Sequence, residues 1–489
     1  MMPIPNKSGH LALDLKGSVV EGLRWSLAAG ARMFGVCLGI AILYFPYDKG
    51  GGSGPAMSSG YAIVTAAAAL AFLVYRTRAG MRLPGALSFG SPRGFAVLIF
   101  GLALSLRLLV LIALPIEPTG DPASHERAAW SVAQGHGYVR DGHPDPHYPP
   151  GYVLFASVFY FLAGREWEVL AAVNCLVDAG TALLVYRVAE TVWSPRGGRL
   201  AALLYALNPA MLINAQVIMY GPLLGLLLVT LVLVHRRPVL FGLAAGVAAL
   251  VKPIVLPVPI LACWVHAIAK RRPVDILRQA AISVVVMMVV ISPWTWRNYV
   301  EFDRVLLISA NGGWVLWWGN NDASEGLMMP WNDEQKATRG PAVIDLDKRM
   351  GREALDWIAE NPLRFLALIP KKQAHTWGTE AASLPDLAGL GATGELLARS
   401  LVQFYYIFLA INVSYICIVR SHTICATQEG QMIVILLLLL LGIHSVYIGW
   451  AFYHQSFLPL MSVVAAGGMG LIERRAAATN AALAGSGGR

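Results

Sequence analysis

Residues 120–152 read G-D-P-A-S-H-E-R-A-A-W-S-V-A-Q-G-H-G-Y-V-R-D-G-H-P-D-P-H-Y-P-P-G-Y. This polar stretch is the segment around which we expect the rest of the chain to be organised. It comes directly after the apolar run 95–114, so Asp121 should lie within a turn or two of the membrane surface. An acid in that place can meet the polar end of a lipid. Residues 123–134 can form a short amphipathic helix, with Trp130 suited to the interface.

The composition is that of a membrane protein. The chain has 489 residues, of which 56% are hydrophobic and 14% are charged. Apolar runs of roughly twenty residues recur along it, the length that a helix needs to cross a hydrocarbon core about 30 Å thick. The formal net charge is +9, but Lys and Arg sit mostly in short clusters between the apolar runs. That pattern is a topology signal and argues against nucleic-acid binding.

The apolar runs predict an all-α integral membrane protein with about twelve transmembrane helices and both chain ends in the cytoplasm. The expected spans are 26–46, 61–75, 95–114, 167–192, 201–217, 223–234, 240–251, 254–267, 280–293, 397–419, 433–451 and 457–472. Every basic cluster between them falls on one side, which the positive-inside rule makes cytoplasmic. Two external loop regions should form a periplasmic layer.

The same pattern divides the chain into five parts. They are two N-terminal spans with a cytoplasmic loop (1–94), a membrane core (95–295) with the first external loop (115–166), an external periplasmic segment (296–396), the C-terminal spans (397–473) and a disordered tail (474–489). In the external segment, 342–360 has the periodicity of a surface helix and 363–369 that of an interfacial one. All five cysteines fall in spans or on the cytoplasmic side, so we expect no external disulfide.

Charged residues at membrane depth cost about 2.5 to 3.5 kcal/mol each at a helix centre, so each needs a partner or a role. Arg107 lies in the span that leads to Asp121, and Asp178 lies in the next span. The two can pair with each other or with helix ends, or Arg107 can help to hold an anionic head group. Lys252 differs because Pro253 interrupts the helix and puts the ammonium at an external boundary, where it can bind a phosphate or anchor the chain.

A third basic residue, Arg297, sits at the exit of a span between Trp296 and Tyr299. A guanidinium there can hold a phosphate through two hydrogen bonds while the aromatic rings rest at the interface, or it can serve as an interfacial anchor. Further along the same external segment, Asn311 and Asn320 lie in glycine-rich turns.

Four histidines share the first external loop with several acids: His125, His136, His143 and His147. The run H-P-D-P-H at 143–147 can be read as a divalent-metal site, but its spacing fits no well-defined ligand pattern. We therefore expect ordinary solvated loop residues there, and no metal or other cofactor.

An external acid, basic groups at the ends of other spans and an aromatic-lined loop suit one type of reaction. A sugar carried on a polyprenyl phosphate presents its anomeric carbon at the membrane surface while its lipid tail stays in the bilayer. Transfer needs a base for the acceptor's proton and cations for the departing phosphate. Asp121 would be the base, and Arg297, Lys252 and Arg107 would hold the donor phosphate.

Three motifs occur in an order that resembles multi-span glycosyltransferases with the C-type fold (GT-C), which include the protein O-mannosyltransferases and the lipid A aminoarabinose transferases. The first is Asp121 followed by A-x-x-x-x-x-G-x-G-Y and Y-P-P-G-Y. The second is P-W-T-W-R-N-Y-x-x-F with N-G-G and G-N-N-D-A-S-E-G, and the third is A-E-N-P-L-R-F. The likeness covers residues 95–373. It implies an inverting transfer from a polyprenyl-phosphate sugar, with Asp121 matching the family's catalytic acid and Lys252 and Arg297 its basic donor contacts.

The sequence also departs from the bacterial members of that family. Pro122 stands where a second acid is common, and Tyr220 stands where many have Glu. His454 and Gln455 replace an Arg-Tyr pair near the last span. The expected substrate-pocket residues are Glu126, His147, Tyr148, Tyr220, Asn311, Asn320 and His454.

Two other functions fit parts of the pattern. A polytopic transporter or flippase of a lipid-linked substrate would use many spans with intramembrane charges, but it predicts paired broken helices and no large external layer. A non-catalytic glycolipid-binding subunit would need no second acid. We expect a glycosyltransferase in a bacterial inner membrane with its active site on the periplasmic side. Its partners would be a polyprenyl-phosphate sugar, the bilayer and an acceptor that is a glycolipid, a polysaccharide or a protein.

Overall fold

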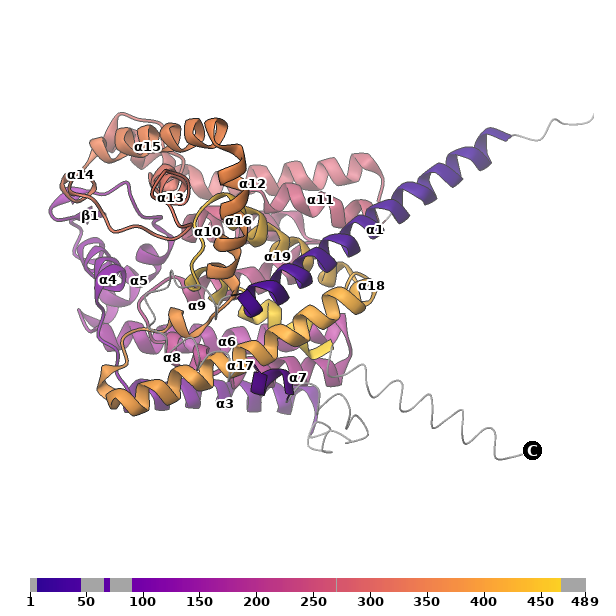
Figure 1. Cartoon of the computed structure of the whole chain (residues 1–489), viewed down its shortest axis with the longest axis horizontal. Helices are drawn as coiled ribbons and strands as arrows, with labels where there is room; N and C mark the ends of the chain where they lie inside the picture. Colours follow the sequence, from indigo (N-terminus) through magenta and orange to yellow (C-terminus); the bar gives the residue numbers. More distant parts are fainter. Residues whose placement is uncertain (1–6, 45–65, 71–89, 270, 468–489) are drawn as a thin grey trace, which may run out of the picture.

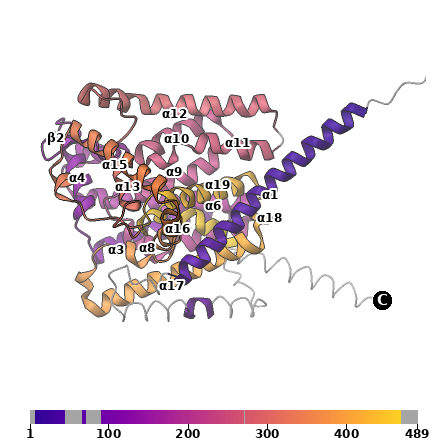
Figure 2. The same ribbon diagram turned by 45° about the horizontal axis from the view of Figure 1, so that its top comes forward.

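The computed structural model describes residues 7–44, 66–70, 90–269 and 271–467, and helices dominate these ranges. Six of the described helices are long and apolar enough to cross a membrane. They are α1 (Lys7–Tyr44), α3 (Pro92–Ala113), α6 (Trp167–Val192), α12 (Pro273–Phe302), α17 (Gly391–Val419) and α19 (Gln428–Val446). Helix α1 crosses over α17 and projects beyond the bundle, and α12 and α17 lie along opposite edges (Figure 1, Figure 2).

Shorter apolar helices fill the space among the long ones. They are α5 (Gly151–Ala163), α9 (Gly221–Val234), α10 (Pro238–Val251), α11 (Val258–Ile268) and a last helix at Leu458–Gly467. Helix α10 packs tightly on α12 because Gly242 has no side chain, since a Cβ there would lie 2.5 Å from the Ser283 carbonyl oxygen. Close backbone approach at small residues is how helices associate in a bilayer, where water gives no driving force.

The predicted all-α architecture with apolar spans is confirmed at this coarse level. The count of about twelve spans stays a prediction, because it adds shorter helices to the long ones. The predicted span 61–75 lies largely outside the described residues, and the tail 474–489 lies wholly outside them.

The predicted span 201–217 is not one helix. The structure has α7 (Pro195–Ala206) and then α8 (Pro209–Asn214). Asn208 separates them because it precedes a proline, which disfavours helical backbone, and its side chain accepts a hydrogen bond from the Ala210 N–H as an N-cap. The sequence prediction missed this break because the residues on both sides of it are apolar.

The predicted span 280–293 is too short, because α12 continues through Pro293 to Phe302. Proline removes the N–H that would bond to the carbonyl of residue 289. The Ser292 hydroxyl donates to that Val289 oxygen instead, at 2.9 Å. A hydroxyl that satisfies the freed carbonyl lets an apolar helix tolerate proline.

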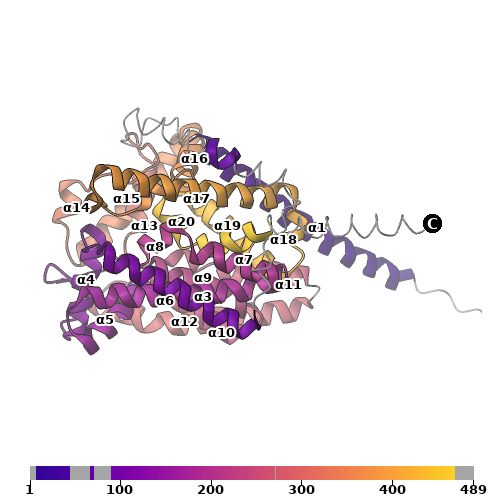
Figure 3. The same cartoon turned by 90° about the horizontal axis from the view of Figure 1, so that it is seen from below.

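The predicted external loop regions gather at one end of the long helices (Figure 1, Figure 3). This external layer contains α4 (Gly120–Ala133), α13 (Gly312–Gly319), α14 (Asp333–Ala337) and α15 (Pro341–Glu360). Helix α5 occupies residues 151–163 of the predicted first external loop, 115–166. The sequence pattern missed a small hairpin in which β1 (Val139–Arg140) pairs antiparallel with β2 (His143–Pro144).

Helices α13 and α15 form the centre of the external layer. They touch at Gly313, where a Cβ would lie 1.9 Å from the Asp347 carbonyl oxygen, so this position requires glycine. The neighbouring Trp314 is fully buried, and its backbone N–H donates to Asp347 Oδ1 at 3.0 Å. Burial raises the pKa of Asp347 to about 6. The predicted surface helix 342–360 is therefore confirmed as α15, with one acidic residue turned inward.

Basic clusters meet at the opposite end of the bundle. Arg236, after α9, pairs with Glu429 at the start of α19 at 2.8 Å. Arg32 of α1 donates to Ser421 at 3.0 Å, beyond the end of α17. The first contact joins two segments that the positive-inside pattern had assigned to one side, and the second joins α1 to the segment after α17.

Candidate active site

A cavity of about 480 Å³ lies between the external layer and the ends of α9 and α10. Six of the sequence-predicted site residues line it: Asp121, His147, Tyr148, Tyr220, Lys252 and Asn311. They come from segments far apart in the sequence. The geometry therefore unites the predicted acid with one of its three predicted basic partners.

Asp121 sits in the first turn of α4, where the positive end of the helix dipole favours a carboxylate. The Tyr148 hydroxyl donates to Asp121 Oδ1 at 2.8 Å. Burial, together with the neighbouring carboxylate, raises the pKa of Tyr148 well above its ordinary value, so the phenol keeps its proton. His125, one turn on, contacts the Asp121 carbonyl oxygen through Nδ1 at 2.8 Å. The carboxylate is thus held by its own helix and by the Y-P-P-G-Y segment.

Lys252 is placed by the end of α10. Pro253 cannot continue the helix, and the backbone of Lys252 turns extended, which directs its side chain into the cavity. The ammonium donates to the Tyr220 hydroxyl at 2.9 Å. It also lies 4.6 Å from the Tyr220 ring centroid and 4.8 Å from that of Tyr453, so two aromatic faces hold it. Burial lowers the pKa of Lys252 to about 8, and the negative charge of Asp121 opposes that shift.

His147 forms part of the opposite wall. Its ring lies 4.6 Å from Trp314 and 5.3 Å from Trp331, and its backbone N–H donates to Asp145 Oδ1 at 2.9 Å. Burial lowers the pKa of His147 to about 3, so the ring is neutral at ordinary pH. Within the described ranges, no group of three or more His, Cys, Asp or Glu residues is arranged to hold a metal ion.

Arg107 lies away from the cavity. Its guanidinium bonds to Asp178 at 2.5 Å and to the Ala206 carbonyl at 3.2 Å, and both charged side chains are completely buried. The Tyr205 hydroxyl also donates to Asp178. Of the two alternatives drawn from the sequence, the structure shows the ion pair that ties α3 to α6. A direct contact with a head group has no geometric support here.

Arg297 also lies outside the cavity lining. It donates to the Tyr138 carbonyl at 3.1 Å, and its guanidinium lies 4.8 Å from the Trp294 ring and 4.9 Å from the Phe302 ring. Arg297 thus links α12 to Tyr138, the residue before the hairpin. Its role as a donor contact stays a prediction.

Three further predicted pocket residues are bonded to charged partners elsewhere in the structure. Glu126 accepts two hydrogen bonds from Arg165, at 2.8 and 3.0 Å. Asn320 accepts from Lys372 at 2.7 Å. His454 pairs with Glu380, as described below. None of the three is among the residues that line the cavity of about 480 Å³.

The residues that sequence reasoning missed are mostly aromatic. They include His125, Trp318, Trp331, Trp450 and Tyr453, all of which line the cavity. Trp450 and Tyr453 belong to G-W-A-F-Y-H-Q, a run that the predicted spans divided between a helix end and a loop. The density of aromatic and polar side chains in this run was the available signal.

The fold and the site together define a polytopic helical membrane protein in which the carboxylate of Asp121 and the ammonium of Lys252 face one cavity. No family model and no curated protein matches the sequence. Two solved structures are similar to it, both of ArnT from Cupriavidus metallidurans. The crystal structure bound to undecaprenyl phosphate has 14% identity and a TM-score of 0.38, and the apo structure has 13% and 0.40. Each match covers 78% of this chain and 78% of that chain.

TM-scores of this size establish no shared activity.

Proposed function

We propose that the protein is a membrane glycosyltransferase that moves a sugar from a polyprenyl-phosphate donor to an acceptor, with inversion at the anomeric carbon. The observation that carries this proposal is that Asp121 and Lys252 face the same cavity. A carboxylate and an ammonium in one partly enclosed space can serve the two charges that change during sugar transfer. The order of the sequence motifs supports the same assignment.

The reaction assigns one task to each group. The acceptor hydroxyl gives its proton to the Asp121 carboxylate while its oxygen bonds to the anomeric carbon. The bond from that carbon to the phosphate oxygen breaks, and the phosphate leaves with the electron pair. Lys252 stabilises the negative charge on the leaving phosphate, and Tyr148 orients the base through its bond to Oδ1. No redox step or metal is needed for this balance.

The surroundings of the cavity suit a lipid-linked donor. The cavity lies where apolar helices meet the external layer, so a phosphate can enter while an isoprenoid chain remains among the helices. Three tryptophans, Trp318, Trp331 and Trp450, offer flat apolar faces of the kind on which sugar rings stack. We place the protein in a bacterial inner membrane with this cavity on the periplasmic side, as its basic opposite end favours.

The other two predicted basic residues, Arg297 and Arg107, support the structure around the cavity and do not line it. Arg297 donates to the Tyr138 carbonyl just before the hairpin, and Arg107 holds α3 against α6. In this proposal Arg297→Ala weakens donor binding less than Lys252→Ala does, because Arg297 acts from outside the cavity.

The test uses purified full-length protein in proteoliposomes with a polyprenyl phosphate that carries a radiolabelled sugar. A transferase moves the label to an added acceptor or, without one, slowly to water. A flippase moves intact donor across the bilayer and leaves the sugar bond whole. Donor translocation without any cleavage would reject the proposal.

A further inference from the structure

Helix α20 (Phe452–Gln455) is one turn long, and its first two side chains reach the proposed donor contact. The Phe452 ring packs edge-on against Tyr220, with centroids 5.5 Å apart. The Tyr453 ring lies 4.8 Å from the Lys252 ammonium. Together with Tyr220, α20 therefore builds the aromatic surroundings of Lys252.

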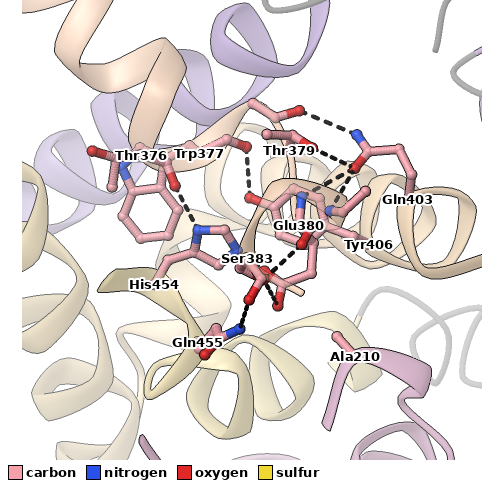
Figure 4. A network of polar contacts seen from close by, with 12 residues as sticks. Ala210, Thr376, Trp377, Thr379, Glu380, Ser383, Gln403, Tyr406, His454 and Gln455 are labelled. Carbon is pink, nitrogen blue, oxygen red and sulfur yellow. Dashed lines mark hydrogen bonds and ion pairs between the residues drawn. The ribbon is translucent and has the colours of Figure 1, made fainter. Parts of the chain in front are cut away.

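The other two side chains of α20 point to a different segment, residues 376–386, which we name the strap. His454 forms an ion pair with Glu380, and both side chains are essentially unexposed. Gln455 donates to the Ser383 carbonyl at 3.4 Å. Figure 4 shows this network, with His454 and Gln455 reaching the strap from one side.

Helix α17 holds the strap from its other side. Gln403 Oε1 accepts from the Thr379 hydroxyl at 2.9 Å and from the Glu380 N–H at 3.0 Å (Figure 4). Arg399 donates to the Ala381 carbonyl at 2.7 Å, and Tyr406 donates to a strap carbonyl at 2.6 Å. Such dense side-chain bonding is needed because the strap has little helix of its own to satisfy its backbone.

The far end of the strap forms a wall of the cavity, because residues 382–386 line it together with Asp121 and Lys252. The strap and the aromatic surroundings of Lys252 are therefore two parts of one site, and α20 contacts both.

The His454–Glu380 contact holds one proton. His454 Nδ1 lies 2.5 Å from the Thr376 carbonyl oxygen, which can only accept, so Nδ1 carries a hydrogen. The contact between Nε2 and Glu380 needs one more proton, which sits on either partner. The Ser383 hydroxyl lies 2.6 Å from the Glu380 carbonyl oxygen and 2.9 Å from Glu380 Oε1, so its one hydrogen is shared between these two acceptors. A pair that is neutral overall avoids the cost of an unmatched buried charge.

We propose that the His454–Glu380 pair is a positioning device, which locks α20 to the strap so that Tyr453 stays against Lys252 and residues 382–386 keep the cavity wall in place. The proposal deepens the function proposed above, since it assumes that Lys252 meets the donor. Both residues act through others and touch no substrate.

The first test compares Glu380→Ala with Glu380→Gln. A glutamine amide can donate to neutral His454 Nε2 and accept from Ser383, so it keeps the lock without a charge, whereas alanine removes it. We expect weaker undecaprenyl phosphate binding and a raised donor KM in Glu380→Ala, with kcat much less affected. Glu380→Gln should match the parent protein, as should Glu360→Ala, a control at an exposed acid of α15. Equal loss in Glu380→Gln and Glu380→Ala would overturn the positioning role and favour proton transfer or charge instead.

A second measurement does not depend on transfer activity. The rate at which a bulky amine-reactive ester labels Lys252, followed by mass spectrometry, reports how closely α20 covers the ammonium. We expect several-fold faster labelling in Glu380→Ala and an unchanged rate in Glu380→Gln. An unchanged rate in folded Glu380→Ala would overturn the inference. If that variant does not fold, Gln455→Ala, which removes one neutral contact, must raise the rate, and no change there would overturn it too.

The two readouts separate the two proposals. Faster labelling of Lys252 without transfer activity in the parent protein would uphold the lock and reject the glycosyltransferase. Transfer activity in the parent protein, with a Lys252 labelling rate that Glu380→Ala does not change, would uphold the glycosyltransferase and reject the lock.

Discussion

Lys252 is the residue on which donor recognition is proposed to depend. A charge-assisted hydrogen bond contributes about 1.5 to 3 kcal/mol, so Lys252→Ala should weaken donor affinity about ten- to a hundredfold. Direct binding of undecaprenyl phosphate to the purified variant measures this. Lys348→Ala, at an exposed lysine of α15, is the matched control and should bind like the parent protein. Equal affinities of Lys252→Ala and the parent would remove Lys252 from the site.

Arg107 leads to a prediction about stability. Arg107→Ala leaves Asp178 buried without its cation, which typically costs about 3 to 5 kcal/mol. We expect a marked fall in the thermal midpoint in detergent. In the double variant Arg107→Leu with Asp178→Leu, apolar packing should restore most of it. A midpoint in Arg107→Ala equal to that of the parent would contradict the structural role.

The sequence placed Asp121 and Lys252 at predicted helix ends near a membrane boundary, and in the structure both line one cavity. The sequence also offered the pairing of Arg107 with Asp178 as one of two alternatives, and the structure shows that pair. The sequence was insufficient for Arg297 and His454, whose partners Tyr138 and Thr376 lie 159 and 78 positions away, because spacing along one chain does not reveal such pairings.

At the scale of elements, the contact between α13 and α15 leads to a prediction about pH. Burial raises the folded-state pKa of Asp347 to about 6, above its value of 3.8 in an unfolded chain. The folded state therefore binds more protons than the unfolded state between these values, so stability falls as pH rises through this window. The contribution is about 3 kcal/mol at most, from about 1.4 kcal/mol per pKa unit. Asp347→Asn keeps the acceptor for Trp314 and removes the titration.

Thermal midpoints of the two proteins between pH 4 and pH 7 measure this effect. The stability of Asp347→Asn relative to the parent should increase with pH and level off above the folded-state value. A difference that does not change with pH would show that Asp347 does not titrate in this range.

Elements with a strong apolar or amphipathic period were predictable. The run 95–114 is α3, and 342–360 is α15. The break at Asn208 and the passage of α12 through Pro293 were not, because one cap and one serine hydroxyl decide them. The hairpin at 139–144 depends on Asp141 and Gly142, both with positive φ (51° and 79°), as its tight turn requires.

The whole molecule has an external layer at one end and basic loops at the other, which predicts its topology. A cysteine placed at Lys348 should react with a membrane-impermeant maleimide added outside intact cells, whereas one placed at Arg237 should react only after permeabilisation. Both native positions are exposed, so accessibility to the reagent is matched. Labelling of the Arg237 position in intact cells would invert the orientation and remove the cavity from the periplasm.

The overall architecture was predictable because the bilayer restricts a chain of this hydropathy to helices that satisfy their own backbone. The arrangement of those helices around a cavity was not. It depends on which helix faces meet. Gly242 allows α12 to pack closely on α10, and α20 contacts both Lys252 and the strap. Such contacts between distant segments leave no periodic signal in the sequence.

The central claim is that Asp121 is the base of a sugar transfer in this cavity. The most direct test is the rate of transfer from a labelled polyprenyl-phosphate sugar by Asp121→Asn, alongside Glu117→Gln, an exposed acid in the segment between α3 and α4. Loss of a general base costs about a hundred- to ten-thousandfold, so we predict that loss in Asp121→Asn with donor binding retained, and none in Glu117→Gln. Transfer by folded Asp121→Asn at the parent rate would contradict the account.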